Sequence, residues 1–366
     1  MKKILVLGQT PPPYGGQAIM IKTFLEGNYS HIKLFHIRMS FSKDMDEMGK
    51  VKIRKIFHLF LIILKAYWYR VIYNIPILYY PPSGPDKLPV IRDMIILTST
   101  RWLFKKTIFH FHAAGLCEIG PKFSGIFRLF FNLSFLRPDI AIRLTTFNPQ
   151  DGIYLKAKKE FIIANGIYDN FSSFSKKSKS TFPECTILFV GFLIESKGVL
   201  VLLEAVKILI EKKLNFTVKI MGKFESAAFQ KKVTQFICNH GINKNVEFLG
   251  VLTGNPKYQS FFNSDIFCFP SFFESESFGL VVVEAMQFGK PVVTTKWRGI
   301  QALVEDGESG YLVPIKDSQA IADKLELLIL NPDLRMRMGR RGRDLYLQHY
   351  TDERFQNNMY NCLKSA

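Results

Sequence analysis

Two glutamates, Glu276 and Glu284, have seven residues between them in the stretch FCFPSFFESESFGLVVVEAMQFGKPVVTT, residues 267–295. The first lies in a polar loop that contains two phenylalanines, and the second lies in a run that reads as a helix. Carboxylates accept hydrogen bonds from hydroxyl groups. A pair held at this spacing could therefore bind two ends of a polyhydroxylated ligand. Two glutamates at arbitrary spacing are usually solvated surface residues, but the elements around this pair argue against that interpretation.

A strand, a loop, a helix and a second strand are expected to position the pair. Residues 266–269 form a short apolar run that ends at Pro270, as a buried parallel strand would. Residues 271–276 are the loop, a helix over 278–288 ends at Gly289, and residues 292–295 form the next strand. On a rise of ~1.5 Å per residue, Glu284 lies about 9 Å along this helix.

The start of this helix predicts an anion site. Ser277 is expected to cap a helix that begins near Phe278 or Gly279. The backbone N–H groups of Phe278, Gly279 and Leu280 would then lack partners within the helix. A phosphate bound there would have one carboxylate on each side. A sugar nucleotide has this layout, with sugar hydroxyls, a diphosphate and ribose hydroxyls in sequence.

The stretch PSFFESESFGLVVVEAMQFGKPVVTT resembles the E-x7-E motif of retaining glycosyltransferases of family 4, which have the GT-B fold. The resemblance implies that Glu276 meets the hydroxyls of the donor sugar and that Glu284 meets the donor ribose. It also implies that the N–H groups after Ser277 bind the sugar and the phosphates. The nucleotide-sugar is then a donor substrate, and no cofactor is expected.

A second resemblance concerns the residues that hold the diphosphate. The stretch ILFVGFLIESKG, residues 187–198, is similar to the family's strand and loop with a lysine that pairs with the diphosphate, and Lys197 fits that position. The family often has an arginine directly after the first glycine, where this chain has Phe192. Either another basic residue takes its place, or Lys197 and helix dipoles hold the charge alone.

Three further positions follow strands, where open α/β sheets bind ligands. Gly15 and Gly16 follow the first strand and lack a Cβ atom, so backbone N–H groups there could approach a donor closely. His112 ends a strand at residues 107–112, where the family has a histidine near the reacting sugar, and His110 on the same strand face is the alternative. The loop after Gly250 is expected to contact the base.

Apolar runs and helical patterns alternate along the whole chain, which predicts two doubly wound parallel sheets. The expected organisation is a Rossmann-like acceptor domain at 1–168, a linker at 169–184, a Rossmann-like donor domain at 185–348, and a helix at 349–366 that crosses back to the first domain. The strands are expected at 3–7, 33–37, 77–80, 107–112, 140–145, 161–164, 186–190, 218–221, 246–249, 266–269, 292–295 and 311–313. The principal helices are expected at 17–26, 52–73, 88–101, 121–135, 197–212, 226–240, 256–264, 278–288, 318–330 and from 335 onwards.

The net charge is +18, and half of it lies in residues 51–130, which hold twelve Lys or Arg against three Asp or Glu. We find no nucleic-acid-binding motif, so nucleic acid is not an expected partner. Residues 52–73 combine basic residues, a nearly continuous apolar run and aromatic residues, as a helix at an anionic membrane surface would. The alternative is a helix buried against its sheet, and both interpretations can hold on different faces.

The remaining observations concern compartment and metals. Five scattered cysteines without a C-x-x-C pair predict free thiols in a reducing cytosol. We expect neither a signal peptide nor a membrane-spanning helix, and therefore a cytoplasmic protein at the inner face of the membrane. Asp44 and Asp46 have the spacing of a metal-binding D-x-D, but they lie in a charged loop of the first domain, and no metal site is predicted.

The expected function is retaining transfer of a sugar, with a UDP-sugar as the favoured donor. The acceptor is expected to be a lipid-linked saccharide in polysaccharide or glycolipid assembly. His112, Glu276 and Lys197 are the predicted catalytic residues. The alternatives are an epimerase of sugar nucleotides or a non-catalytic sugar-nucleotide-binding subunit on the same fold.

Overall fold

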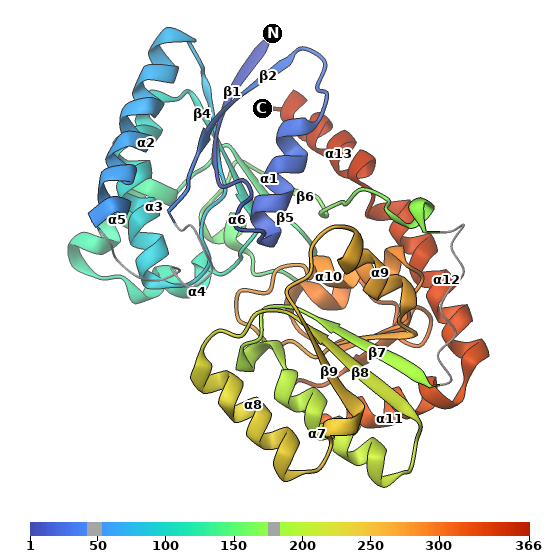
Figure 1. Cartoon of the computed structure of the whole chain (residues 1–366). Helices are drawn as coiled ribbons and strands as arrows, with labels where there is room; N and C mark the ends of the chain where they lie inside the picture. Colours follow the sequence, from blue (N-terminus) through green and yellow to red (C-terminus); the bar gives the residue numbers. More distant parts are fainter. Residues whose placement is uncertain (42–52, 175–183) are drawn as a thin grey trace. The chain divides into compact units, whose positions relative to one another are not determined.

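The computed structural model of the chain describes residues 1–41, 53–174 and 184–366 (Figure 1). The chain divides into two compact units, residues 1–166 with 352–366, and residues 167–351. Each unit contains one six-stranded sheet in which every pairing is parallel. The predicted α/β class with two doubly wound sheets is confirmed.

The sheet of the first unit has the strand order β2-β1-β3-β4-β5-β6. Its strands are β1 (Lys2–Gly8), β2 (Ile32–Arg38), β3 (Ile77–Tyr80), β4 (Lys106–Phe111), β5 (Ile140–Arg143) and β6 (Lys159–Ile162). Its helices are α1 (Gly16–Glu26), α2 (Ile53–Ile72), α3 (Lys87–Thr100), α4 (Leu116–Ile119), α5 (Gly125–Phe135), α6 (Asp151–Tyr154) and α13 (Asp352–Lys364). Helices α1 and α13 lie on one face of this sheet, and α2, α3 and α5 lie on the other (Figure 1).

The sheet of the second unit has the strand order β12-β11-β10-β7-β8-β9. Its strands are β7 (Cys185–Val190), β8 (Phe216–Met221), β9 (Val246–Gly250), β10 (Ile266–Phe269), β11 (Val292–Thr295) and β12 (Gly310–Val313). Its helices are α7 (Val199–Glu211), α8 (Ala227–Asn239), α9 (Asn255–Asn263), α10 (Leu280–Gln287), α11 (Ser318–Leu330) and α12 (Pro332–His349).

The apolar runs became strands because helices cover both faces of each sheet. Every residue of β3, β7, β10 and β11 is buried. Parallel strands in this position carry continuous apolar sequence rather than an alternating pattern. That continuity made β3, β10 and β11 predictable to the residue. The one-turn helices α4 and α6 were not predicted, because four residues are too few to show a helical period.

Part of the segment predicted as a linker packs against the second unit. Among its described residues, 169–174, Asp169 pairs with Arg343 of α12, and Phe174 is 2% exposed and contacts the ring of Phe288. Residues 175–183 of that segment, and Asp44 and Asp46, lie outside the described residues. At the other end, α13 and the first unit's C-terminal segment begin at Asp352 rather than at residue 349.

None of the helices within residues 1–41, 53–174 and 184–366 has the length and apolarity needed to cross a bilayer. Helix α2 nevertheless turns most of its apolar residues to the surface, and only Ile62 and Ala66 are buried in it. The face with Ile62 and Ala66 packs on the sheet, and the other residues of α2 are half-buried or exposed. Contact of the exposed side with a membrane stays a prediction.

Candidate functional site

Glu276 and Lys197 form an ion pair in the second unit. Glu276 lies in the loop between β10 and α10 and is 9% exposed. The Ser271 hydroxyl also donates to the same carboxylate oxygen, Oε2, at 3.1 Å. The Lys197 ammonium lies over the Phe273 ring, 4.6 Å from its centroid. A sheltered cation and a sheltered carboxylate therefore meet at one point, although they lie in different loops.

Glycine at position 198 allows the loops that carry Lys197 and Glu276 to pack closely. Lys197 ends a 3₁₀ turn, Glu195–Lys197, that follows β7. Gly198, next in the chain, has φ +81°, and a Cβ atom there would lie 2.1 Å from the carbonyl oxygen of Pro270. The backbone N–H of Phe272 donates to the carbonyl of Ser196 at 2.8 Å. The loop after β7 and the loop after β10 are thus packed backbone to backbone.

The pair lies at the switch point of the second sheet. Strands β7 and β10 are neighbours there, and β8 and β9 continue to one side while β11 and β12 continue to the other. Ligands of open α/β sheets bind beyond the carboxyl ends of the strands at such a point, because the two flanking crossovers leave a crevice. Lys197 and Glu276 follow the carboxyl ends of these two strands.

Glu284 has a partner that sequence reasoning missed. Its Oε1 atom lies 2.6 Å from the ammonium of Lys257, on the first turn of α9. Its Oε2 atom is buried and has no hydrogen-bond partner among the described residues. The free oxygen can accept a hydrogen bond from a hydroxyl group of a ligand. Lys257 is not an apolar or motif position, and nothing in the sequence pairs it with a residue 27 positions away.

The start of α10 differs from the prediction. Ser277 does not cap the helix: the cap residue is Gly279, with φ +83°, and α10 begins at Leu280. The Ser277 hydroxyl instead donates to the carbonyl of Ser275 at 3.3 Å, and the Phe278 side chain is buried. A residue with left-handed backbone cannot continue a helix, and Gly279 is the residue that adopts it without strain. The helix N–H groups available to an anion therefore begin at Leu280.

Gly250 is explained by its backbone conformation. It ends β9 with φ +66°, and its carbonyl accepts the N–H of Gly222 at 2.9 Å. A side chain in this left-handed conformation would be strained. The role of the following loop in binding a base stays a prediction.

Gly15 and Gly16 lie where the first unit's β1 gives way to α1. Gly15 is the cap residue of α1 with extended backbone, φ −96°, and a Cβ atom there would meet open space. Arg38 holds the preceding loop through the carbonyls of Thr10 and Pro12, at 3.1 and 2.6 Å. Backbone conformation does not require glycine at position 15, so close approach of a ligand remains the interpretation of this glycine.

His112 follows the end of β4, one residue beyond the strand. Its ring lies 4.0 Å from the ring of His110, centroid to centroid. Both ring nitrogens of His112 are buried and have no hydrogen-bond partner in the described part of the chain. Burial lowers the pKa of the His112 imidazole to about 3. The imidazole is therefore neutral at physiological pH and can donate one hydrogen bond and accept another.

His110 is already engaged in the core. Its Nδ1 atom lies 2.6 Å from the hydroxyl of Tyr79, and the side chain is fully buried. Burial, with a smaller contribution from His112, holds the pKa of His110 well below its ordinary value. Of the two histidines, His112 is the one whose two ring nitrogens both lack a hydrogen-bond partner among the described residues.

Asp151 fixes the loop that follows His112 and was not predicted. Its carboxylate accepts the backbone N–H groups of Gly115 at 2.8 Å and Cys117 at 2.7 Å. These two bonds hold the start of α4, and burial raises the pKa of the Asp151 carboxyl. A single aspartate after Pro149 and Gln150 belongs to no motif, so the sequence did not indicate this role of Asp151.

Within residues 1–41, 53–174 and 184–366, no group of three or more His, Cys, Asp or Glu side chains is placed to hold a metal ion. Phe192 is half-buried in the loop after β7, where it contributes no charge.

Comparison with known sequences finds relatives of the second unit. Residues 171–345 match the family model of glycosyl transferases group 1. A phosphatidyl-myo-inositol mannosyltransferase of Mycobacterium leprae is 33% identical over 177 residues, 48% of this chain and 46% of that protein. A capsular polysaccharide biosynthesis glycosyltransferase, CapM of Staphylococcus aureus, is 30% identical over 176 residues, 48% of this chain and 44% of that protein. The chain thus aligns with less than half the length of these curated relatives.

Comparison with solved structures covers both units. The sucrose-phosphate synthase of Thermosynechococcus elongatus superposes with a TM-score of 0.75 at 17% identity, covering 100% of this chain and 99% of that one. HepE of Anabaena, solved in complex with UDP, superposes with a TM-score of 0.74 at 18% identity, covering 100% of both chains. These likenesses establish the fold, which is GT-B.

Proposed function

We propose that this chain, whose residues 171–345 match the family model of glycosyl transferases group 1, is a retaining glycosyltransferase. It moves a hexose from a nucleotide-sugar, with a UDP-sugar as the favoured donor, to a lipid-linked saccharide. HepE, which has the same fold, was crystallised with UDP-glucose, and this supports the choice of base. The names of the relatives that act on phosphatidyl-myo-inositol or in capsule synthesis support the class of acceptor.

The observation that carries the proposal is the Lys197–Glu276 pair at the switch point of the second sheet. Without donor, the two charges neutralise each other. With donor, Glu276 would accept hydrogen bonds from the sugar hydroxyls while Lys197 turned toward the diphosphate. The free oxygen of Glu284 would accept a hydrogen bond from a ribose hydroxyl. The three groups thus match the three parts of a sugar nucleotide.

Catalysis in this proposal is mainly electrostatic. The hydroxyl oxygen of the acceptor bonds to the anomeric carbon on the face from which the nucleoside diphosphate departs. The bond between that carbon and the phosphate oxygen breaks, and the departing oxygen takes the proton of the acceptor hydroxyl. Lys197 and the first-turn N–H groups of α10 stabilise the negative charge that grows on the leaving diphosphate. Glu276 orients the sugar and is not required as a nucleophile.

The first unit is proposed to serve the acceptor. The neutral imidazole of His112 can donate to, or accept from, a sugar or acceptor hydroxyl without carrying charge. The basic and apolar surface of α2 supports an acceptor held in a membrane, and therefore a peripheral protein at the inner face of the cell membrane.

A thermal-shift panel of UDP, GDP, ADP and their common sugars tests the donor site. A ligand at ~100 times its Kd adds about 2.7 kcal/mol to the free energy of unfolding. One nucleotide should stabilise the wild type and stabilise Glu284→Ala less. If none of these nucleotides stabilises the wild type, the assignment of a donor site is contradicted.

Transfer itself needs a second measurement. The selected nucleotide-sugar, labelled in the sugar, is incubated with membranes, and the label is followed into the lipid fraction. The anomeric configuration of the product is read by NMR, and inversion would contradict the retaining mechanism. Nucleotide binding without transfer would favour a non-catalytic subunit, and conversion of the free sugar nucleotide into its epimer would favour an epimerase.

A further inference from the structure

The outer face of α2 is apolar over its whole length. The exposed apolar residues of α2 recur at intervals of one, three and four, and their fractional exposure runs from 48% at Leu64 to 87% at Ile53. They are Ile53, Ile56, Phe57, Phe60, Leu64, Trp68, Val71 and Ile72. Scattered exposed apolar residues are ordinary, but a contiguous stripe of this size marks a binding surface.

The stripe continues onto two neighbouring helices. The hydroxyl of Tyr67 on α2 donates to the carbonyl of Ser99 on α3 at 2.9 Å, and its ring lies 5.9 Å from that of Trp102. The guanidinium of Arg101 donates to the carbonyl of Ser134 on α5 at 2.9 Å. Exposed apolar residues on these neighbours, and on the 3₁₀ turn Arg101–Leu103 that follows α3, are Leu88, Ile95, Trp102, Ile126, Phe127, Leu129, Phe130 and Leu133. We call this set, with the stripe on α2, the apolar face.

Charge decides which partner the apolar face suits. Helices α2 and α5 contain no Asp or Glu. The single acidic residue of α3, Asp93, is buried and accepts hydrogen bonds from Tyr80 and Ser83. Arg92 pairs with Asp93 at 2.7 Å, and the other basic residues of the three helices are Arg54, Lys55, Lys65, Arg70, Lys87 and Arg128. A second copy of this chain would bring the same positive charge against it, whereas anionic lipid headgroups complement it.

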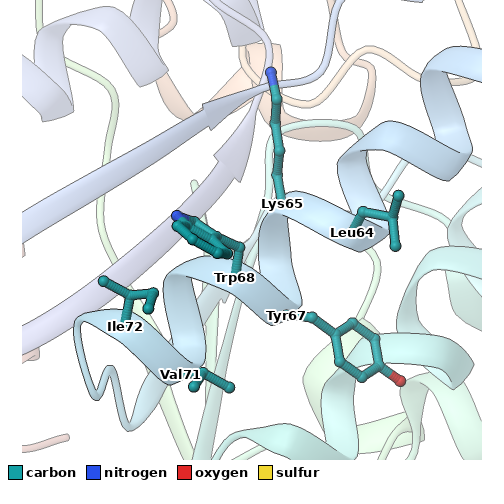
Figure 2. A pocket seen from close by; sticks show the side chains of 6 residues that line it. All are labelled: Leu64, Lys65, Tyr67, Trp68, Val71 and Ile72. Carbon is teal, nitrogen blue, oxygen red and sulfur yellow. The ribbon is translucent and has the colours of Figure 1, made fainter.

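The surface of α2 also has the side chains typical of a lipid interface. A pocket on α2 is lined by Leu64, Lys65, Tyr67, Trp68, Val71 and Ile72, whose side chains Figure 2 shows. The Lys65 ammonium extends away from the helix. Tryptophan and tyrosine favour the boundary between headgroups and acyl chains, and lysine reaches the phosphates while its methylene groups stay in apolar surroundings.

We propose that the apolar face inserts into the acyl-chain boundary of an anionic membrane, with α2 lying in the membrane plane. This deepens the proposed function, because it rests on a membrane-held acceptor and names the surface that reaches it. Insertion differs from adsorption by charge alone: it buries side chains among acyl chains, so it should persist when salt screens the headgroups.

The three tryptophans of the chain provide the test. Trp68 and Trp102 lie in the apolar face, whereas Trp297 lies in the second unit, with its indole N–H donating to the carbonyl of Phe273. Trp297→Phe leaves reporters only in the face, and Trp68→Phe with Trp102→Phe leaves only Trp297. Both proteins are mixed with vesicles of phosphatidylcholine and phosphatidylglycerol, with and without brominated acyl chains.

Insertion predicts a blue shift and at least twofold quenching by brominated lipid for Trp297→Phe, and no change for the double variant. Pelleting at low salt without quenching would overturn the proposal in favour of adsorption. A lipid-free dimer that fails to form when Phe57 and Phe60 are replaced by Glu would overturn it in favour of a second copy as the occupant.

A matched pair of variants excludes a general effect of added charge. Phe57→Glu with Phe60→Glu should lower vesicle binding at least tenfold, also at high salt. Leu330→Glu with Leu347→Glu replaces two exposed residues of α11 and α12, which are 58% and 45% exposed. This pair should leave vesicle binding unchanged. Equal loss in both pairs would overturn the proposal. Nucleotide thermal shifts on all variants distinguish membrane insertion from donor binding. If only insertion is wrong, nucleotide still stabilises the wild type and the variants. If the donor site is wrong, nucleotide does not stabilise the wild type.

Discussion

Glu284 and Lys257 form an ion pair with Oε1 and Nζ 2.6 Å apart, and this pair leaves the second carboxylate oxygen of Glu284 buried and without a hydrogen-bond partner among the described residues. Lys257 thus fixes the orientation of the carboxylate through one oxygen, while the other oxygen stays available to a ligand. Buried acceptors normally have partners, so an unpaired oxygen of this kind indicates a place for a donor group such as a ribose hydroxyl.

The first prediction concerns the ribose. If the free oxygen of Glu284 accepts a ribose hydroxyl, the wild type should bind UDP about 10–100 times more tightly than its 2′- or 3′-deoxy analogue, because a hydrogen bond to a charged group contributes about 1.5–3 kcal/mol. Isothermal titration calorimetry measures the ratio. Glu284→Gln, which keeps the size of the side chain, should reduce it. An unchanged ratio in that variant would show that the ribose lies elsewhere.

The second prediction concerns Lys257. Lys257→Met leaves the Glu284 carboxylate buried without its cation, so the free energy of unfolding should fall by about 1–3 kcal/mol. The side chain of Lys257 is 20% exposed, and water therefore limits the loss. Urea denaturation measures it. The double variant Lys257→Met with Glu284→Gln should recover most of the stability, and additive losses would contradict the pairing.

The third prediction concerns Lys197. Lys197→Met removes the proposed cation at the leaving diphosphate, and kcat should fall about 10²–10³-fold, as when one electrostatic group of a transition state is lost. Lys197→Arg should retain part of the rate because the charge remains. Lys232→Met is the matched control, since Lys232 is an exposed lysine that pairs with Glu195 at 3.2 Å, and its rate should not change. Steady-state kinetics with the donor identified by the thermal-shift panel supply the measurement.

The fourth prediction concerns the charge of His112. Because burial lowers its pKa to about 3, its ring signal in NMR spectra should not move between pH 8 and pH 5, whereas an ordinary histidine titrates near pH 6.5. His112→Asn identifies the signal. A midpoint near pH 6.5 would contradict the buried, neutral ring.

The same pKa shift has a consequence for stability. Between pH 6.5 and about pH 3, the unfolded chain protonates this histidine and the folded chain does not. The unfolding free energy therefore falls as the pH drops through that window, by at most about 1.4 kcal/mol per pH unit for one such group. His112→Gln should be less sensitive to acid than the wild type when urea denaturation is compared at pH 7.5 and pH 5.

Much of the fold could be predicted from local sequence, because helices cover both faces of each sheet. Such strands are continuous apolar runs, and the turns between them carry glycine, proline and polar residues. The β10–loop–α10 segment with Glu276 and Glu284 could be identified for the same reason: its spacing is local. The start of its helix was predicted with Ser277 as the cap, and the left-handed backbone of Gly279 instead makes that glycine the cap residue.

The tertiary structure decided which side chains meet and which faces remain exposed. Lys197 and Glu276 lie 79 residues apart and pair because strand order makes β7 and β10 neighbours. Lys257 reaches Glu284 from another helix, and no local pattern encodes that contact. Helix α2 is apolar on most sides, so its periodicity does not say which side packs on the sheet. The sequence by itself determined the elements and the local motif, because these depend on near neighbours. Packing alone determined the ion pairs and the apolar face, because these depend on residues far apart in the chain.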